Sequence, residues 1–143
     1  MIANYYNMVD CFNLCNMDYF DGKLLFPQFK IMHSYRKLGL FQCEYGSMFD
    51  KTLYDPTISI SVYYDLTEEQ FKNVMCHEMI HYYLAYFGID RKCKHGKEFT
   101  KMAEKLNKKY GLHIARLVNT STLKRSKNAP WLSYWLLHNY GRI

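Results

Sequence analysis

A central stretch of this sequence constrains the fold more than any other part, because it specifies a strand and then a helix. Residues 57–65 alternate large apolar side chains with smaller or polar ones, which is the period of a half-buried strand. Thr67 and Gln70 follow as a capping-box pair at the start of a helix. No helix breaker occurs before Gly88, so this central helix is predicted to end at residue 86 or 87.

The rest of the chain adds helices and short strands, so the predicted fold class is α+β. Apolar residues at helical spacing predict a helix over residues 3–20, and β-favouring residues predict short strands at 29–34 and 38–45. A further helix is predicted from about His95 to Tyr110, closed by Gly111. We therefore expect a short sheet of about three strands packed on the central helix, with two further helices around it.

Length and composition predict a single domain across residues 1–143, since 49% of the residues are hydrophobic and 22% are charged. Its core is expected at about 5–115, followed by a basic loop at 119–128 and an aromatic segment at 129–143. The N-terminal residues lack a signal-peptide pattern, and no apolar run is long enough to cross a membrane. Five cysteines without a CxxC pair read as reduced thiols, so we expect a soluble cytoplasmic protein that makes no membrane contact.

The central helix carries the sequence His77-Glu-Met-Ile-His81, an HExxH motif. The i, i+4 spacing places both imidazoles on one face of the helix, where both can bind one Zn²⁺. Glu78 is adjacent to the first histidine, where a carboxylate can take a proton from activated water. The helix is apolar nearly all round and is therefore expected to be buried, and two buried imidazoles beside a carboxylate are costly unless a metal holds them. The motif thus predicts a zinc site with Glu78 as general base.

The third zinc ligand is chosen by the phase of the helix predicted from residue 95 onward. His95 falls within the stripe that faces the core, whereas Glu98 lies at the edge of that stripe. Glu104 falls among lysines on the outer face. His95 is therefore the predicted ligand, and Cys93 is the weaker alternative because a thiolate also binds zinc.

These residues resemble the SprT-like zinc metallopeptidase domain over about residues 5–115. The resemblance is carried by HEMIHYYL at 77–84, HGKEF at 95–99, Asn107, GLHI at 111–114, YFDGKLL at 19–25 and SYRKLG at 34–39.

The resemblance implies a small zincin-like fold of the minigluzincin type. It also implies one zinc ion per chain, bound by His77, His81 and His95, with Glu78 as the catalytic base that hydrolyses a protein or peptide substrate. The family includes Spartan-type proteases that degrade proteins crosslinked to DNA, which points to nucleic-acid-associated proteins as a substrate class.

Positive charge is concentrated in the second half of the chain. Residues 90–127 contain 12 basic and 3 acidic residues, whereas the net charge of the whole chain is +6. This asymmetry is typical of a protein with a polyanionic partner, and we expect phosphate contacts with single-stranded DNA or with RNA. The alternative is a solvated basic face. An alternative function is a nucleic-acid-binding module with a mainly structural zinc site. The residues concerned are Lys97, Lys101, Lys105, Lys108, Lys124, Arg125 and Lys127.

Peptide hydrolysis at zinc usually involves a second electrophilic side chain beside the metal. The sequence does not choose among four candidates, which are Tyr82, Tyr83, Tyr110 and His113. The strand expected at 57–64 precedes the metal helix, and an edge strand near the cleft could bind substrate by β-addition, although the sequence does not say which strand forms that edge.

Overall fold

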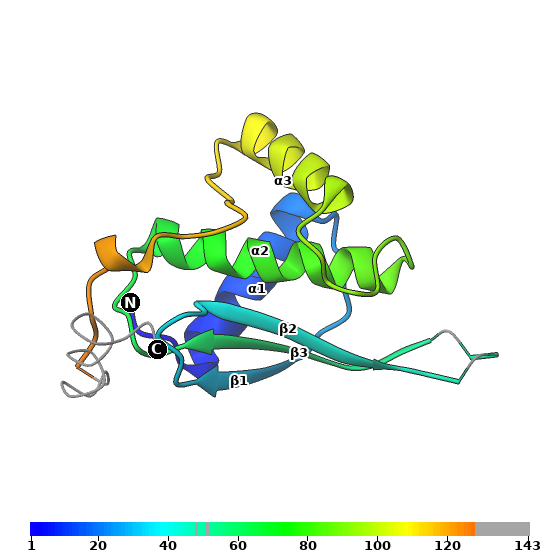
Figure 1. The fold of residues 1–143 in the computed structure, drawn as a ribbon, viewed down its shortest axis with the longest axis horizontal. Helices are drawn as coiled ribbons and strands as arrows, with labels where there is room; N and C mark the ends of the chain where they lie inside the picture. Colours follow the sequence, from blue (N-terminus) through cyan, green and yellow to red (C-terminus); the bar gives the residue numbers. More distant parts are fainter. Residues whose placement is uncertain (48, 51, 128–143) are drawn as a thin grey trace.

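The computed structural model describes residues 1–47, 49–50 and 52–127, and the aromatic segment predicted at 129–143 lies outside these residues (Figure 1). The described part is an α+β arrangement, as the sequence predicts. In chain order its elements are α1 (Tyr5–Tyr19), β1 (Gln28–Met32), β2 (Gly39–Tyr45), β3 (Leu53–Ser61), α2 (Glu68–Tyr86), α3 (Lys97–Tyr110) and the short 3₁₀ helix η1 (Thr120–Thr122).

The sheet is mixed and has the strand order β1-β3-β2. β3 pairs in parallel with β1, so that Phe29 lies opposite Ile58, and it pairs in antiparallel fashion with β2, so that Phe41 also lies opposite Ile58. Ile58 and Ile60 of β3 are fully buried, in agreement with the central position of β3 in the sheet. β2 is consequently an edge strand of this sheet.

β3 begins and ends earlier than the alternating pattern predicts, because the chain changes partners after Ser61. Beyond that residue the amide of Asp65 donates to the Lys124 carbonyl, 2.8 Å away, and Tyr64 forms an isolated bridge with Arg125. The apolar alternation therefore continues to Tyr64, but the sheet does not. Lys124 and Arg125, which pair with the chain after Ser61, belong to the segment predicted as a basic loop.

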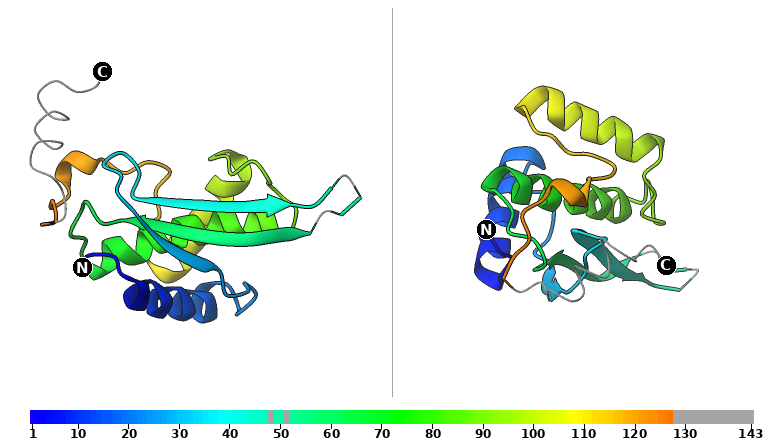
Figure 2. Two further views of the ribbon diagram at one scale, coloured as in Figure 1. Left: turned by 90° about the horizontal axis from the view of Figure 1, so that it is seen from below. Right: turned by 60° about the vertical axis from the view of Figure 1, so that its left-hand side comes forward.

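The helices form two layers over one face of the sheet. α1 and α2 pack against the strands, and α3 packs on α2 on the side away from the sheet (Figures 1 and 2). The predicted capping box is present: the Thr67 hydroxyl accepts from the Gln70 amide at 3.1 Å, and the Gln70 side chain accepts from the Thr67 amide at 2.9 Å. Side chains such as Met75, Met79 and Tyr82 are fully buried around α2. No helix in the described part of the chain is both long enough and apolar enough to cross a bilayer.

Candidate metal centre

Three histidine side chains converge on one point beside α2. The Nε2 atom of His95 lies 2.9 Å from Nε2 of His77 and 3.1 Å from Nε2 of His81. The three rings offer ligand atoms that all lie within 4.8 Å of one another. Nitrogens that each bind one Zn²⁺ at about 2.0–2.1 Å must lie at roughly this separation from one another. The structure thus brings together the three histidines that the sequence nominates.

Two of these histidines come from α2 and the third comes from the loop between α2 and α3. That loop is held by Asp90, whose carboxylate accepts from the amides of Lys92 and Lys94, both at 2.9 Å. It is also tied to β2, because the Tyr45 hydroxyl donates to the Arg91 carbonyl at 3.1 Å. These contacts deliver His95 to the metal helix immediately before α3 begins.

Phe99 forms the apolar backing of the histidine cluster. Its ring centroid lies 4.7 Å from those of His77 and His81 and 5.0 Å from that of His95, and its side chain is buried. In the sequence, Phe99 is noted as the last residue of the HGKEF motif. Its position shows that the first turn of α3 packs directly on all three candidate ligands and restricts their rotamers.

The segment 112–118 covers the cluster and orients His77. The Nδ1 atom of His77 lies 2.8 Å from the Ala115 carbonyl oxygen, to which it donates as an N–H. Asn107 on α3 holds the adjacent residue, since its side-chain amide donates to the Ile114 carbonyl at 3.0 Å and its oxygen accepts from the Ile114 amide at 2.8 Å. Because Nδ1 carries the proton, the Nε2 lone pair of His77 is free to bind a metal.

Glu78 lies behind the cluster, buried between α2 and the start of β2. Its Oε1 atom is 3.9 Å from Nε2 of His77, and its carboxylate accepts from the backbone of Phe41. A Cβ atom on Gly39 would lie 2.9 Å from both Cγ and Oε1 of Glu78, so the absence of a side chain at Gly39 makes room for this carboxylate. Burial raises the pKa of Glu78 to about 8, against the lowering effects of the Phe41 backbone and the Lys37 charge.

The histidine rings are held in the neutral, metal-binding form. Burial lowers the pKa of His77 to about 4 and that of His81 to about 3, and burial also lowers the pKa of His95. Among the described residues, the buried Nδ1 atom of His81 has no hydrogen-bond partner. Neutral rings whose lone pairs point at one another are unfavourable unless a cation lies between them. The donor set therefore fits a divalent metal ion of the zinc type.

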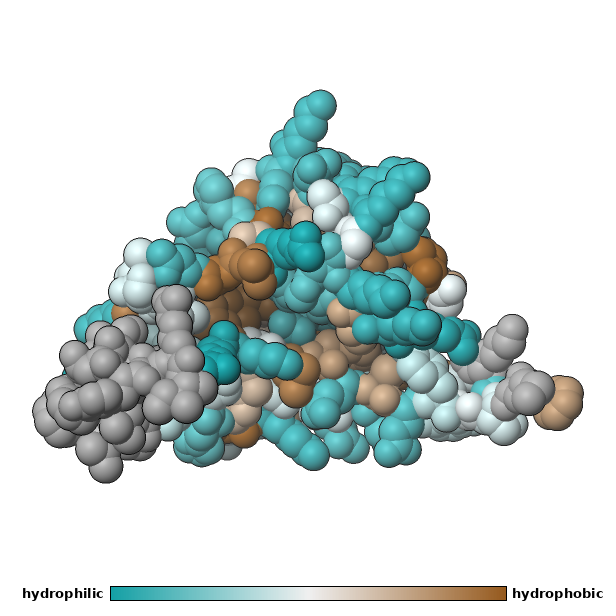
Figure 3. Space-filling model, viewed as in Figure 1, coloured by the Kyte–Doolittle hydropathy of each residue, from teal (hydrophilic) through white to brown (hydrophobic). Residues whose placement is uncertain are grey.

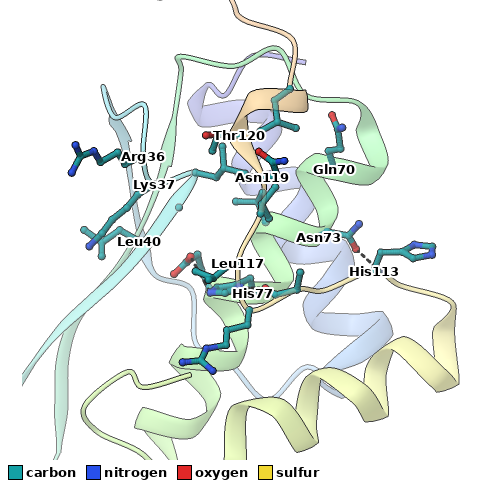
Figure 4. Close-up of a pocket in the computed structure, with 18 of the residues that line it drawn as sticks. Arg36, Lys37, Leu40, Gln70, Asn73, His77, His113, Leu117, Asn119 and Thr120 are labelled. Carbon is teal, nitrogen blue, oxygen red and sulfur yellow. Dashed lines mark hydrogen bonds and ion pairs between the residues drawn. The ribbon is translucent and has the colours of Figure 1, made fainter. Parts of the chain in front are cut away.

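A cavity of about 740 Å³ opens in front of the cluster. Its walls are β2 with the residues before it, the first half of α2, and the segment 112–123 (Figure 4). Hydrophobic side chains gather around a hollow on this face of the molecule and hydrophilic ones border it (Figure 3). The candidate metal centre is therefore accessible to a substrate.

The four candidates for a second electrophile lie in other places. Tyr82 is buried and its hydroxyl donates to the Leu25 carbonyl at 2.9 Å, Tyr83 packs on Phe20, and Tyr110 packs on Tyr19. These tyrosines do not line the cavity described here.

His113 does line the cavity, but its ring points away from His77 (Figure 4). Its Nδ1 atom is 2.8 Å from Glu69. Among the four candidates, none faces the histidine cluster in the described part of the chain.

The alternative third ligands are also placed. Glu98 and Glu104 are exposed on α3, outside the histidine cluster. Cys93 is half-buried and lines the cavity, yet it is not a member of the cluster. The arrangement favours His95 over these alternatives.

The predicted basic residues form two groups rather than one surface. Those on α3 are exposed, and α3 lies over α2 on the side away from the sheet. Those after η1 lie beside the end of β3, at the other end of α2, where Lys124 forms an ion pair with Asp65 at 3.4 Å (Figures 1 and 2). The two groups are Lys97, Lys101, Lys105 and Lys108, and Lys124, Arg125 and Lys127.

Fold and site together define a class, an α+β domain with a three-histidine candidate metal centre on its longest helix. The model of the SprT-like family matches residues 8–122, and the chain belongs to this family. The resemblance seen in the motif residues is thereby confirmed. No curated protein matches the chain closely enough to count as a relative.

Proposed function

We propose that this chain is a zinc-dependent metallopeptidase with a small zincin-like fold. The observation that carries the proposal is the convergence of three histidine Nε2 atoms next to a buried carboxylate that faces an open cavity. Three protein ligands with room for a fourth are typical of catalytic zinc, whereas structural zinc is usually enclosed by four ligands. Membership of the SprT-like family supports the same activity.

In this proposal His77, His81 and His95 hold one zinc ion per chain. Bound zinc acts as a Lewis acid toward the scissile carbonyl and makes water a stronger acid at neutral pH. A divalent cation held by the three histidines would lower the raised pKa of the nearby Glu78 and favour its ionised form. The ionised Glu78 side chain takes the proton from the attacking water and passes it to the leaving amine, which is general acid–base catalysis by one residue. The Phe41 amide and the space beside Gly39 hold the Glu78 carboxylate in place for both transfers.

The edge strand β2 is the proposed binding strand for the substrate backbone. β3 is the central strand, so the segment at 57–64 does not supply this edge. β2 pairs with β3 on one side, and its residues 39–41 line the cavity on the way to Glu78. An extended peptide can add to such an edge through main-chain hydrogen bonds. This would bring a peptide bond past the metal centre.

We also propose that the lysines on α3 contact nucleic acid, so that proteins bound to single-stranded DNA or RNA are substrates. Support comes from the exposure of these side chains on one helix that packs on the metal helix. Replacing Lys101, Lys105 and Lys108 with Glu should weaken binding to fluorescent single-stranded DNA and reduce its salt dependence, with zinc content unchanged. Equal binding by the wild type and this variant would instead assign the lysines to a solvated face.

The Glu78→Gln substitution tests the peptidase proposal. We expect hydrolysis of a denatured protein substrate to fall by about 10²–10⁴-fold while zinc content and fold are retained. Glu98→Gln makes the same chemical change on the exposed face of α3 and should keep full activity. Equal turnover by wild type and Glu78→Gln at equal zinc occupancy would reject the catalytic role and favour the alternative of a mainly structural zinc in a nucleic-acid-binding module.

A further inference from the structure

The cavity in front of the metal centre carries positive charge that has no carboxylate partner. Lys37, from the chain before β2, lines one wall, and Arg116, from the 112–118 segment, lines another. Neither side chain forms an ion pair with a carboxylate among the described residues. Of the carboxylates on the cavity wall, Glu69 is occupied by His113 at 2.8 Å and Glu78 is buried.

Two of the cations that line the cavity act electrostatically on the candidate site, and a third packs against an aromatic ring. The positive charge of Lys37 reaches the Glu78 carboxyl, and that of Arg116 reaches His95. Arg36 also borders the cavity, but its guanidinium lies 5.6 Å from the centroid of the Tyr35 ring and points away from α2 (Figure 4). The chain thus supplies two exposed cations on the cavity wall, Lys37 and Arg116, whose charges act on the site, and an adjacent one, Arg36, that packs on Tyr35.

The walls between these cations are apolar. Leu38 and Leu40 line the β2 side, and Leu117 and Val118, which are 81% and 48% exposed, line the other side. The hydrophobic area around the hollow in Figure 3 lies on this face. Charges beside apolar walls act more strongly than charges in open water, so an anion that enters the cavity is attracted more strongly than one on the outer surface.

A polypeptide fits this cavity better than a nucleic acid does. Among the described residues that line the cavity, Phe41 is the one Phe, Tyr or Trp, and its side chain is buried. These lining residues therefore offer no exposed Phe, Tyr or Trp ring on which a nucleic-acid base could stack. Glu69 and Glu78 would also oppose a polyphosphate that runs through the cavity. A single carboxylate on a peptide meets the cations and leaves both of these groups undisturbed.

We propose that Lys37 and Arg116 together select polypeptide substrates that carry a carboxylate beside the scissile bond. This inference rests on the proposed peptidase function. It specifies the substrate class of that peptidase as acidic polypeptides. The carboxylate can belong to an Asp or Glu side chain or to the C-terminus of the peptide. Both sources present the same group to a lysine ammonium and an arginine guanidinium.

The test measures peptide binding by zinc-loaded Glu78→Gln protein, so that it does not depend on turnover. Fluorescent, C-terminally amidated peptides that differ only in a central Glu, Gln or Lys are titrated at low salt. We expect the Glu peptide to bind about three- to tenfold more tightly than the Gln peptide, and the Lys peptide to bind most weakly. A Gln peptide with a free C-terminus shows whether the selected carboxylate is terminal.

The variants assign the preference to the two cations. Lys37→Gln combined with Arg116→Gln should remove the difference between the Glu and Gln peptides, and the double change to Glu should reverse the order so that the Lys peptide binds best. Arg36→Glu is the matched control and should keep the wild-type order. Zinc content of each variant reports whether the site is intact.

Three results would overturn the proposal. The first is an unchanged affinity difference between the Glu and Gln peptides in both double variants, and the second is an equal change of that difference in Arg36→Glu. The third is that single-stranded DNA displaces the Glu peptide and that only the double variants lose DNA binding. The last result would assign the cations to phosphate. The binding test does not require hydrolysis, so it gives an answer on the carboxylate preference even if the chain has no peptidase activity. The activity assay with Glu78→Gln tests the proposed peptidase function separately.

Discussion

The two halves of the candidate metal centre are built by different means. His77, Glu78 and His81 lie on α2, a helix capped by Thr67 and packed on nearly every side. His95 and the segment that covers the cluster lie in irregular chain before and after α3, and a few polar side chains hold them. The helix half is therefore fixed by backbone hydrogen bonds and core packing, and the loop half depends on individual contacts.

Removal of a helix histidine should have the largest effect. His77→Ala and His81→Ala should each weaken zinc binding by more than about 100-fold, because either change destroys the ligand pair that α2 preorganises. His95→Ala should also lose zinc, but less completely, since that pair remains. Chelator competition on the purified variants measures the three affinities.

His33→Ala serves as the control, because His33 is exposed and is not part of the cluster. If His95→Ala retained full zinc while Cys93→Ala or Glu98→Ala lost it, the third ligand would be wrong. In that case Cys93 or Glu98, and not His95, would be the third ligand.

The metal-free protein should lose stability on both sides of mildly acidic pH. The Glu78 pKa of about 8 lies above its ordinary 4.5, so the unfolded chain releases a proton that the native protein keeps, and stability falls as pH rises from 4.5 to 8. His77 has the opposite sign: its pKa falls from 6.5 to about 4, so the unfolded chain binds a proton first and stability falls as pH drops through that window. Urea unfolding in the presence of a chelator measures both limbs.

We expect the alkaline limb to reach a few kcal/mol, on the order that the shift in the Glu78 pKa implies. Glu78→Gln should flatten that limb and leave the acidic limb unchanged. An identical slope in wild type and variant would show that the carboxyl does not titrate as a buried group.

Gly39→Ala should displace the Glu78 carboxylate, the proposed general base, without changing a candidate metal ligand. The new Cβ would lie 2.9 Å from Glu78 and 3.1 Å from Val74, so the Glu78 side chain must move. A displacement of this kind should lower kcat/KM by about 10- to 100-fold while zinc content stays constant. Gly96→Ala is the matched glycine change, because nothing lies within 4 Å of a Cβ at that position, and it should be near neutral. Comparable kcat/KM values for the two variants would contradict the role given to Gly39.

Asn107→Ala should have the smallest of these effects and tests the loop half. Loss of both hydrogen bonds to Ile114 frees the Ala115 carbonyl from its place beside His77, and zinc affinity should fall by about tenfold. Nitrogen NMR of the His77 ring should show a mixture of tautomers in the metal-free variant. Asn119→Ala is the control, since among the described residues that side chain accepts hydrogen bonds within its own turn, from the amide and hydroxyl of Ser121. An unchanged tautomer in Asn107→Ala would separate the 112–118 segment from the chemistry.

The helix half of the site is predictable from the sequence because its causes are local. Spacing puts His77 and His81 on one face, and Thr67 with Gln70 sets where the helix begins. His95 is nominated correctly by extending the phase of the next helix back to it, although that helix begins two residues later, at Lys97, and His95 lies in the loop before it. The β3 boundary is not, because the alternation up to Tyr64 does not distinguish a sheet partner from the strand-like partner at Arg125.

The loop half escapes sequence reasoning for a different reason. The oxygen that orients His77 is a main-chain carbonyl, which every residue carries, so the identity of Ala115 gives no signal. Gly39 acts through the side chain that it lacks. Asn107 was visible only as part of a family resemblance, without a role. Charge counting alone does not show that Lys124 lies apart from the lysines of α3, beside Asp65 at the other end of α2.

Within the described part of the chain, α3 meets its neighbours along one face, which includes the buried Phe99, Ala103 and Leu106 together with Met102, Asn107 and Tyr110. On that face Phe99 packs on the candidate ligands and Asn107 holds Ile114. The opposite face can change at little cost, because exposed substitutions usually alter stability by less than about 0.5 kcal/mol. The outer residues of α3 can therefore change during evolution without altering the contacts that support the candidate metal centre. The same division offers a protein engineer a surface on which new binding residues can be introduced without disturbing the candidate metal centre.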